Sequence, residues 1–517
     1  MTLIAVPIAV SDPAEVADAL HTAQDVRLRG ADVIEWRVDT LADAQASGTQ
    51  SVGILLADSP AQTLLTARSD TEGGLCTLDD EALADWFGDL LDAGCQPNWV
   101  DVEFDRWQRS AAIQAVAKRW QAEGVRVLFS SHEYTGRPTD LHQRIAAMQE
   151  APCDAVKMVW RARSLRDGLE CRDILASRQK PMIVLCMGPA GVMSRIMTGA
   201  WGGLLTFASS SVTSMSAPGQ PTIDELLHQY RFRQLDQATA IYGLIGDPLG
   251  RSPGFVMHNH AFDQAGVNAV YLPMPVAAGW ESLKATLAEL VGRSDIEFRG
   301  ASVTLPHKQD LVRYAKEQGG VIADIVDRCG AANTLSVDAD GEIAVDNTDV
   351  MGIVKPLLAM GFEPNGSKVA ILGAGGVARA AVAALLPLGA TVHVFNRTPA
   401  RVATLVEAMQ PFGSVHVGSV EAGPFNAIVQ GTPIGMAHGD HPQENPLEVL
   451  GLDATVMMAP GSVAVETIYD PVETPFVVAM REVGTNVATG QDMWLAQAAE
   501  QLQRWTGRSP AKKDWTL

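Results

Sequence analysis

The sequence predicts an α/β protein with an N-terminal (β/α)8 barrel, followed by a two-lobed α/β region whose second lobe is of the Rossmann type. Its 517 residues exceed what one ordinary hydrophobic core accommodates, so several domains are expected. Two observations predict the architecture. Short apolar runs recur about every thirty residues in roughly the first 210 residues, with helical periodicity between them. Near residue 373, an apolar run leads through a glycine-rich turn into an alanine-rich segment.

The barrel follows from the apolar runs of the first half. Parallel strands need crossover helices, and eight strand–helix units close into a barrel. We expect helices such as 81–91 and 110–121 between the strands. The predicted strands are residues 3–10, 33–38, 63–67, 99–104, 125–129, 155–160, 182–186 and 204–207.

The seam between the halves contains a Pro/Gly-rich loop at 216–220, an expected helix at about 223–235 and a new apolar strand at 241–245. We therefore predict a barrel over 1–228 and a linker helix over 229–239. A first lobe over 240–345 and a Rossmann-type lobe over 346–488 follow. The last segment, 489–517, is predicted to be a helix that returns to the first lobe.

Composition and charge narrow the classes of partner. The formal net charge of -21 argues against binding to nucleic acid or to an anionic membrane, so the expected partners are small molecules. The six cysteines form no C-x-x-C pair or Cys/His cluster, so no zinc or other metal site is predicted and a reducing, cytoplasmic location is expected. No apolar run is long enough to span a membrane, and residues 1–10 indicate a buried strand rather than a signal peptide.

Polar side chains stand at the carboxyl ends of the predicted barrel strands, where (β/α)8 enzymes carry their catalytic groups. Lys157 interrupts the apolar run 155–160, and a desolvated lysine amine can attack a carbonyl to form a Schiff base. His132 follows the fifth predicted strand and is a candidate general base. The alternatives are a buried lysine neutralised by Glu35 and a surface histidine. The other polar residues at these ends are Glu35, Arg37, Arg68, Glu72, Asp101, Glu103, Ser194 and Arg195.

In their order along the chain, these residues resemble type I 3-dehydroquinate dehydratase. The matching stretches are 35–37, 68 with 72–74, 131–132, 157, 194–195 and 216–220. The resemblance implies that Lys157 forms an iminium with the ketone of 3-dehydroquinate. His132, assisted by Glu72, would then move the protons to give 3-dehydroshikimate. Arg195 would pair with the substrate carboxylate, and the remaining implied ligands are Glu35, Arg37, Arg68, Ser216 and Gln220.

A nucleotide site is predicted in the second half, where the buried strand of segment 368–379 meets a helix start. Backbone N–H groups at such a start hold a pyrophosphate. The next strand, 391–395, is followed by Arg397 rather than an acidic residue, which favours the 2′-phosphate of NADP over the 2′-hydroxyl of NAD. The alternative is a pair of solvated arginines. The predicted cofactor ligands are Gly373, Ala374, Gly375, Gly376, Val377, Ala378, Asn396, Arg397, Thr398 and Arg401.

Lys308 and Asp349 form a candidate acid/base couple for a hydroxyl being oxidised, the alternative being a surface salt bridge. With stretches 302–308, 330–334, 346–349, 431–436, 468–471 and 490–498 they resemble shikimate dehydrogenase, from about residue 241 onward. The resemblance implies reduction of 3-dehydroshikimate to shikimate by NADPH. Lys308 and Asp349 would act at the reacting oxygen and the adjacent hydroxyl. The implied substrate ligands are Ser252, Thr304, Asn333, Tyr469 and Gln497, and Thr432 and Gly490 are further cofactor ligands.

Three positions depart from the second family's pattern. Gly254 stands where a second serine is usual, which removes a donor and opens space for a quinate-like substrate. Gln430 replaces an asparagine, and Val350 replaces a glycine. The leading hypothesis is a bifunctional enzyme of the shikimate pathway, because the product of the first half is the substrate of the second. The alternatives are a second half that acts mainly on quinate, and a metabolite-binding regulator without catalysis.

Overall fold

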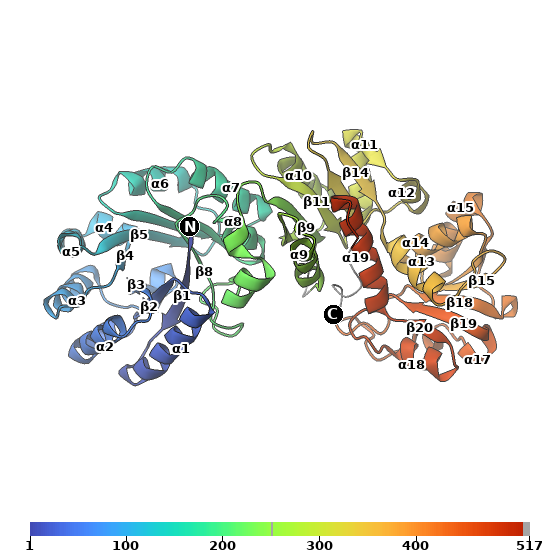
Figure 1. Cartoon of the computed structure of the whole chain (residues 1–517), viewed down its shortest axis with the longest axis horizontal. Helices are drawn as coiled ribbons and strands as arrows, with labels where there is room; N and C mark the ends of the chain where they lie inside the picture. Colours follow the sequence, from blue (N-terminus) through green and yellow to red (C-terminus); the bar gives the residue numbers. More distant parts are fainter. Residues whose placement is uncertain (250–251, 510–517) are drawn as a thin grey trace. The chain divides into compact units, whose positions relative to one another are not determined.

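The computed structural model describes residues 1–249 and 252–509, which contain three sheets with their covering helices (Figure 1). The chain folds into two compact units. One comprises Met1–Thr239 and Asn268–Val276, and the other comprises Ala240–Val267 and Ala277–Leu517. Within the described ranges, no helix is both long enough and apolar enough to cross a lipid bilayer.

The first sheet is the predicted (β/α)8 barrel. Its eight strands pair in the order β7-β6-β5-β4-β3-β2-β1-β8, and a hydrogen bond from Leu204 N to Met182 O, 2.7 Å long, links the two ends. The strands are β1 (Leu3–Ala9), β2 (Val33–Arg37), β3 (Gln62–Thr66), β4 (Trp99–Glu103), β5 (Arg126–Glu133), β6 (Ala155–Arg161), β7 (Met182–Met187) and β8 (Leu205–Phe207). The covering helices are α1 (Val16–Arg29), α2 (Gln45–Ala57), α3 (Asp80–Asp92), α4 (Phe104–Arg109), α5 (Ala111–Ala122), α6 (Leu141–Glu150), α7 (Leu165–Ala176) and α8 (Val192–Met197).

The barrel interior is apolar at the amino ends of the strands and polar above. Every residue of the apolar floor is buried, which is the usual filling of a (β/α)8 barrel. The floor leaves the carboxyl ends of the strands as the place where polar groups gather. Its residues are Ala5, Val33, Leu64, Trp99, Leu128, Ala155, Ile183 and Leu205.

Two predictions about the barrel strands need correction. Strand β5 was expected to end at Phe129, but it continues to Glu133 because its polar end still pairs with β6, so His132 lies within the strand. Lys157 was expected at a strand end. It is the third residue of β6, beside Ser130 of β5, and therefore lies deeper in the barrel.

The predicted linker helix over 229–239 is also wrong. A π-helical turn, Glu225–Gln229, and a 3-10 turn, Phe232–Gln234, occupy this region. Arg231 between them has a φ of 51°, a left-handed conformation that a continuous α-helix excludes. Burial of Phe232, at 3% exposure, accompanies this break in the helix.

The second sheet is mixed, with strand order β10-β9-β11-β13-β14-β12. Strand β11 is parallel to β9 and antiparallel to β13. The strands are β9 (Ala240–Gly246), β10 (Ala269–Pro275), β11 (Phe298–Val303), β12 (Val321–Ile322), β13 (Thr334–Val337) and β14 (Ile343–Asp346). The helices in this part of the chain are α9 (Gly254–Gln264), α10 (Trp280–Gly292), α11 (Lys308–Gln318) and α12 (Asp324–Cys329).

The third sheet has the strand order β17-β16-β15-β18-β19-β20, which is the order of a Rossmann fold. Its neighbouring strands pair in parallel. The strands are β15 (Lys368–Leu372), β16 (Thr391–Phe395), β17 (Val415–Val417), β18 (Phe425–Gln430), β19 (Met458–Glu466) and β20 (Asn486–Ala488). The helices are α13 (Asp349–Ala359), α14 (Gly376–Leu385), α15 (Pro399–Met409), α16 (Pro446–Val449), α17 (Ala454–Met457), α18 (Pro475–Glu482) and α19 (Gly490–Thr506).

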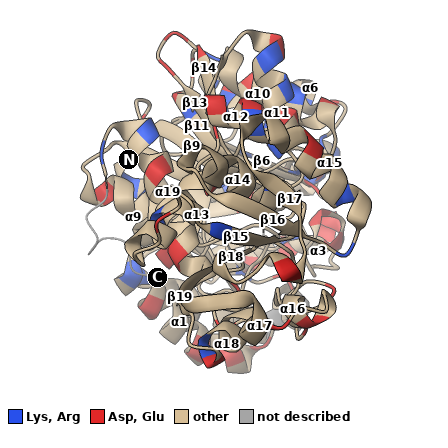
Figure 2. Ribbon diagram, turned by 90° about the vertical axis from the view of Figure 1, so that its right-hand side faces the viewer, with Lys and Arg blue, Asp and Glu red and all other residues tan. Residues whose placement is uncertain are grey.

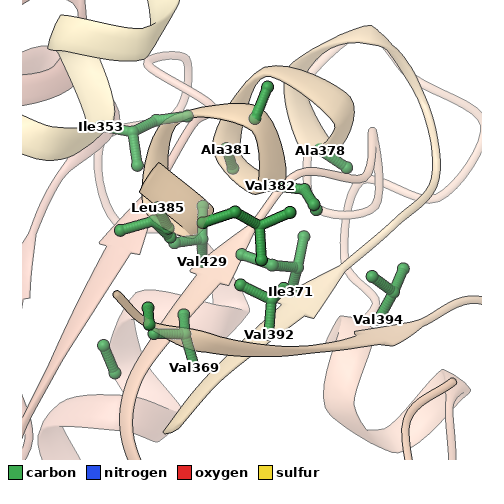
Figure 3. Close-up of a cluster of buried hydrophobic side chains, with 14 of the residues drawn as sticks. Ile353, Val369, Ile371, Ala378, Ala381, Val382, Leu385, Val392, Val394 and Val429 are labelled. Carbon is green, nitrogen blue, oxygen red and sulfur yellow. The ribbon is translucent and has the colours of Figure 1, made fainter. Parts of the chain in front are cut away.

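The core of this Rossmann-type lobe lies between the strands and helix α14. Figure 3 shows the alanines and branched side chains of α14 packed over the valines and isoleucine of the strands. The central strands β15, β16 and β18 carry one charged residue, Lys368, and Figure 2 shows the charged residues mixed over the surrounding helices and loops. Strands that are buried on both faces have continuous apolar sequences, and β15 and β16 were predicted from such sequences.

Candidate active sites

The centre of the barrel holds Lys157, a lysine that is only 4% exposed. Its Nζ lies 3.3 Å from Glu35 Oε1 and 3.5 Å from Asp101 Oδ2, and 4.3 Å above the ring of Phe207. Glu35 also accepts a hydrogen bond from the Thr66 hydroxyl. The alternative of a lysine balanced by a carboxylate thus describes its surroundings correctly. That balance keeps the amine inside a desolvated cavity, where it can meet a carbonyl.

His132 and Glu72 form a pair beside this lysine. The His132 Nδ1 lies 2.9 Å from Glu72 Oε2, which also accepts the His132 backbone N–H. Burial lowers the pKa of His132 well below its ordinary value, and the cations Arg68 and Lys157 lower it further. Burial raises the pKa of Glu72 to about 8, against the opposing effect of Arg68. The lowered pKa of His132 favours the neutral imidazole, which is available as a base.

Arg68 connects the His132–Glu72 pair with the carboxylate beside Lys157. Its Nη1 donates to Glu72 and to Ser130 Oγ, and its Nη2 donates to Asp101 Oδ2 at 2.6 Å. Burial alone raises the pKa of Asp101, but Arg68 and Lys157 outweigh that effect and the net shift is downward. Asp101 is therefore an ionised carboxylate between the lysine and the arginine.

Arg195 differs from the other cations of the site. It is 2% exposed, and its Nε donates to the Cys186 carbonyl at 3.0 Å. In the described part of the chain no carboxylate forms an ion pair with it, and burial lowers its pKa to about 10. A buried guanidinium without a counter-ion is suited to an anionic group of a ligand.

The other predicted substrate ligands are held by protein groups. Arg37 binds Asp39 through two hydrogen bonds of 3.1 and 2.6 Å. Gln220 is buried, and its Oε1 accepts from the backbone N–H and hydroxyl of Ser216, both at 2.9 Å. The amide nitrogen of Gln220 is buried without a partner among the described residues. These contacts position the 216–220 loop and leave a donor for a ligand.

One cavity unites most of these side chains. All of the catalytic and substrate-binding residues predicted for the barrel line it except Gln220, and apolar side chains complete the wall. The lining consists of Glu35, Arg37, Arg68, Glu72, His132, Tyr134, Lys157, Val159, Leu185, Met187, Arg195, Phe207, Ser216 and Ala217.

In the second unit, Lys308 and Asp349 make a partly buried ion pair, with Nζ 2.5 Å from Oδ2. Lys308 begins α11 and Asp349 begins α13. The Asn333 Nδ2 donates to Asp349 Oδ1 at 2.8 Å, and Asn333 Oδ1 accepts the Thr348 N–H. The alternative of a surface salt bridge is incorrect, because Asp349 is only 7% exposed and held from two sides.

The remaining predicted substrate ligands of this unit are less closely connected. Gln497 of α19 accepts a hydrogen bond from the Thr348 hydroxyl, which adjoins Asp349. The hydroxyl of Ser252 accepts from Gly254 N, so it caps the start of α9. Within residues 1–249 and 252–509, neither Ser252, Thr304 nor Tyr469 forms a hydrogen bond with Lys308 or Asp349.

The glycine-rich turn between β15 and α14 fits a bound pyrophosphate. A Cβ added at Gly375 or Gly376 would meet no atom within 4 Å, so the space above both residues is open. No side chain caps the first N–H groups of α14. Gly373 has φ +109°, and a Cβ there would lie 2.8 Å from the Gly431 carbonyl oxygen. The turn thus needs glycine for its own shape at one position and leaves room for a ligand at the next two.

Several predicted cofactor residues have protein partners. The side chains of Val377 and Ala378 belong to the hydrophobic core or pack on it, so only their backbone faces the turn. The Thr432 N–H and hydroxyl donate to Gln430 Oε1, and Gln430 Nε2 donates to two carbonyls of the same loop. The long side chain of Gln430 thus holds this loop from within. A Cβ at Gly490 would lie 1.9 Å from the Ile468 carbonyl oxygen, so glycine allows a close approach there.

The ribose side of the turn is basic. Arg397 and Arg401 are exposed and form no ion pair with any described residue. The Asn396 side chain donates to the Thr398 carbonyl and so shapes the loop after β16. Two unpaired cations beyond the second strand fit a 2′-phosphate.

Comparisons with known proteins agree with the families that the two halves of the chain resemble. The family model for type I 3-dehydroquinase matches residues 4–237, and the model for the shikimate dehydrogenase substrate binding domain matches residues 244–335. A relative from Arabidopsis thaliana, "Bifunctional 3-dehydroquinate dehydratase/shikimate dehydrogenase, chloroplastic", is 30% identical over 501 residues, which are 94% of this chain and 79% of that protein. The chain belongs to this bifunctional family.

Further relatives match either the whole chain or its second half. The shikimate biosynthesis protein AroDE of Chlamydia pneumoniae is 26% identical over 92% of this chain and 90% of its own length. The NADP(+) shikimate dehydrogenase of Carboxydothermus hydrogenoformans is 34% identical over 54% of this chain and 96% of its own length. These names give no support to a quinate dehydrogenase or to a non-catalytic regulator.

Sequence reasoning missed two residues at the barrel site and one buried carboxylate in the Rossmann-type lobe. Asp39 holds Arg37 and also accepts the Arg68 backbone N–H. Tyr134 lines the barrel cavity. Glu466, fully buried at the end of β19, accepts hydrogen bonds from the N–H groups of residues 467 and 468 and from Thr474. The position of each at a strand end was the available signal.

Proposed function

We propose that this chain catalyses two consecutive reactions of the shikimate pathway. The barrel dehydrates 3-dehydroquinate to 3-dehydroshikimate, and the second unit reduces 3-dehydroshikimate to shikimate with NADPH. The observation that carries the first assignment is the cavity that holds Lys157, the His132–Glu72 pair and the unpaired Arg195 together. The six cysteines of the chain, all without disulfide bonds, support a cytoplasmic location.

In the barrel, Arg195 binds the substrate carboxylate and thereby turns the ketone toward Lys157. The unprotonated Nζ attacks the ketone carbon, and loss of water gives an iminium. His132 removes a proton from the adjacent carbon, because the iminium accepts the electron pair as an enamine. The enamine expels the hydroxyl group, which takes the proton from His132 and leaves as water. Hydrolysis of the iminium releases 3-dehydroshikimate and restores the Lys157 amine.

In the second unit, the ketone oxygen of 3-dehydroshikimate lies at Lys308. NADPH, held by the 373–376 turn and by Arg397, supplies the hydride when it is bound. Lys308 donates a proton to the oxygen as it becomes a hydroxyl, and Asp349 keeps the ammonium in place and accepts the adjacent substrate hydroxyl. Asn333 fixes the Asp349 carboxylate through its second oxygen.

A coupled assay tests both reactions in the intact chain. With 3-dehydroquinate and NADPH, wild type should consume NADPH and form shikimate, identified by mass spectrometry. Formation of 3-dehydroshikimate without shikimate would reject the reductase assignment, and recovery of unchanged 3-dehydroquinate would reject the dehydratase assignment.

The lysines have matched controls. Lys157→Ala should lose dehydration by at least about 10³-fold and should no longer be trapped by borohydride, whereas Lys118→Ala on the surface helix α5 should behave as wild type. A Lys157→Ala chain that still dehydrates at a near-normal rate contradicts the Schiff base. Lys308→Ala should lose shikimate formation while NADPH binding survives, and Lys316→Ala on the same helix is its control.

A further inference from the structure

Two residues with hydroxyl groups that the mechanism above does not use line the barrel cavity; the Ser216 hydroxyl donates to Gln220, which leaves that of Tyr134. This residue follows β5 directly, two positions after His132, and lines the same cavity as Glu72 and Arg195. Within the described residues its hydroxyl makes no hydrogen bond. Burial raises the pKa of this phenol, with the cations Arg68 and Arg37 acting in the opposite direction, so the hydroxyl stays protonated and is a donor at neutral pH.

The backbone is shaped to receive this side chain. Gly73 has φ +78°, and a Cβ there would lie 2.3 Å from Tyr134 Cζ and 2.4 Å from its hydroxyl oxygen. The hydroxyl end of the ring therefore rests on the Gly73 backbone, next to Glu72. Only glycine permits both that contact and the left-handed conformation. The ring is thus held with its polar end within the cavity wall.

The position of the hydroxyl indicates which part of the substrate it meets. The hydroxyl end of its ring lies against Gly73, the neighbour of Glu72, and Tyr134 lines the same cavity as Arg195. In 3-dehydroquinate, the carbon that carries the carboxylate also carries the departing hydroxyl. A donor that shares one cavity with a carboxylate-binding arginine and the proton-transferring pair is therefore suited to the groups on that carbon.

We propose that the Tyr134 hydroxyl is a second hydrogen-bond donor to the substrate carboxylate, alongside Arg195. This inference rests on the proposed dehydratase function and adds a ligand to it. Arg195 supplies the charge that a carboxylate needs, and a neutral phenol on the cavity wall supplies a further donor without adding charge. Such a bond is the same in substrate and transition state, so it acts on KM and leaves kcat unchanged.

The test compares Tyr134→Phe with wild type in the full chain. One lost hydrogen bond to a charged group should raise the KM for 3-dehydroquinate about tenfold, with kcat within about threefold of wild type. Tyr230→Phe, outside the cavity, is the matched control and should change neither. Shikimate formation from 3-dehydroshikimate by the same chain monitors folding and should be unaltered.

A second readout separates this inference from the dehydratase assignment. In the Lys157→Ala background, the Kd of 3-dehydroquinate measured by calorimetry should rise about tenfold on Tyr134→Phe, whether or not wild type turns the compound over. An unchanged Kd and KM would overturn the inference. A fall in kcat with unchanged KM would also overturn it, because the hydroxyl would then act on the reacting atoms.

Discussion

Replacement of Arg195 by methionine should weaken substrate binding in the barrel and, at the same time, stabilise the folded barrel. Burial lowers the pKa of this arginine from its ordinary value to about 10, which corresponds to about 3 kcal/mol of unfavourable free energy for keeping its charge in the folded state. Removal of the guanidinium forfeits its hydrogen bond to the Cys186 carbonyl, about 1 kcal/mol. The methionine chain fills a similar volume, so the net gain is about 2 kcal/mol.

The same change removes the partner of the substrate carboxylate. We expect kcat/KM for 3-dehydroquinate to fall by about 10²- to 10³-fold, the cost of a charge-assisted, paired hydrogen bond in a desolvated site. Calorimetry of the intact chain, with the two units fitted as separate transitions, measures the stability. If Arg195→Met lowers the melting temperature of the barrel transition, the argument that Arg195 lacks a counter-ion fails. Lys180→Met, outside this cavity, is the control for loss of a positive charge.

Three further predictions concern other groups. Glu72→Gln should lower dehydratase kcat by about 10- to 100-fold, and an unchanged kcat would show that His132 acts without its partner. Arg397→Asp should raise the KM for NADPH by at least about 100-fold and lower that for NADH, because it places a carboxylate where a 2′-phosphate is bound; equal effects on both cofactors would contradict this assignment. Burial raises the pKa of Glu466 to about 7, so the folded lobe binds more protons than the unfolded chain between pH 4.5 and 7 and should lose up to about 3 kcal/mol of stability as pH rises through that window. Glu466→Gln should flatten that profile in urea denaturation, and a profile identical to wild type would refute it.

The sequence predicted the elements whose apolar pattern is strong. The strands of the barrel stand out as apolar runs, so their number was predictable, and strands β15 and β16 of the Rossmann-type sheet were predicted in the same way. The end of β5 was not, because Ser130 and His132 are polar yet remain paired in the sheet. The linker helix failed for a different reason. Periodicity does not report the left-handed Arg231 that breaks the segment.

The candidate sites show the same division. The types of residue at the strand ends were informative, since Lys157, His132 and Arg195 do line one cavity. What could not be predicted is how the charges are distributed among partners. Arg68 is committed to three carboxylates, whereas Arg195 has none in the described chain, and both are simply arginines in the sequence. Partner choice depends on distances across the barrel between residues far apart in the chain.

The apolar floor of the barrel limits how substrate, product and water enter and leave the cavity. Residues such as Trp99 and Leu128 fill the bottom of the barrel beneath Lys157, so the cavity is a dead end with its mouth at the carboxyl ends of the strands. Substrate, product and every water molecule of the dehydration must pass the same mouth, beside the 216–220 loop.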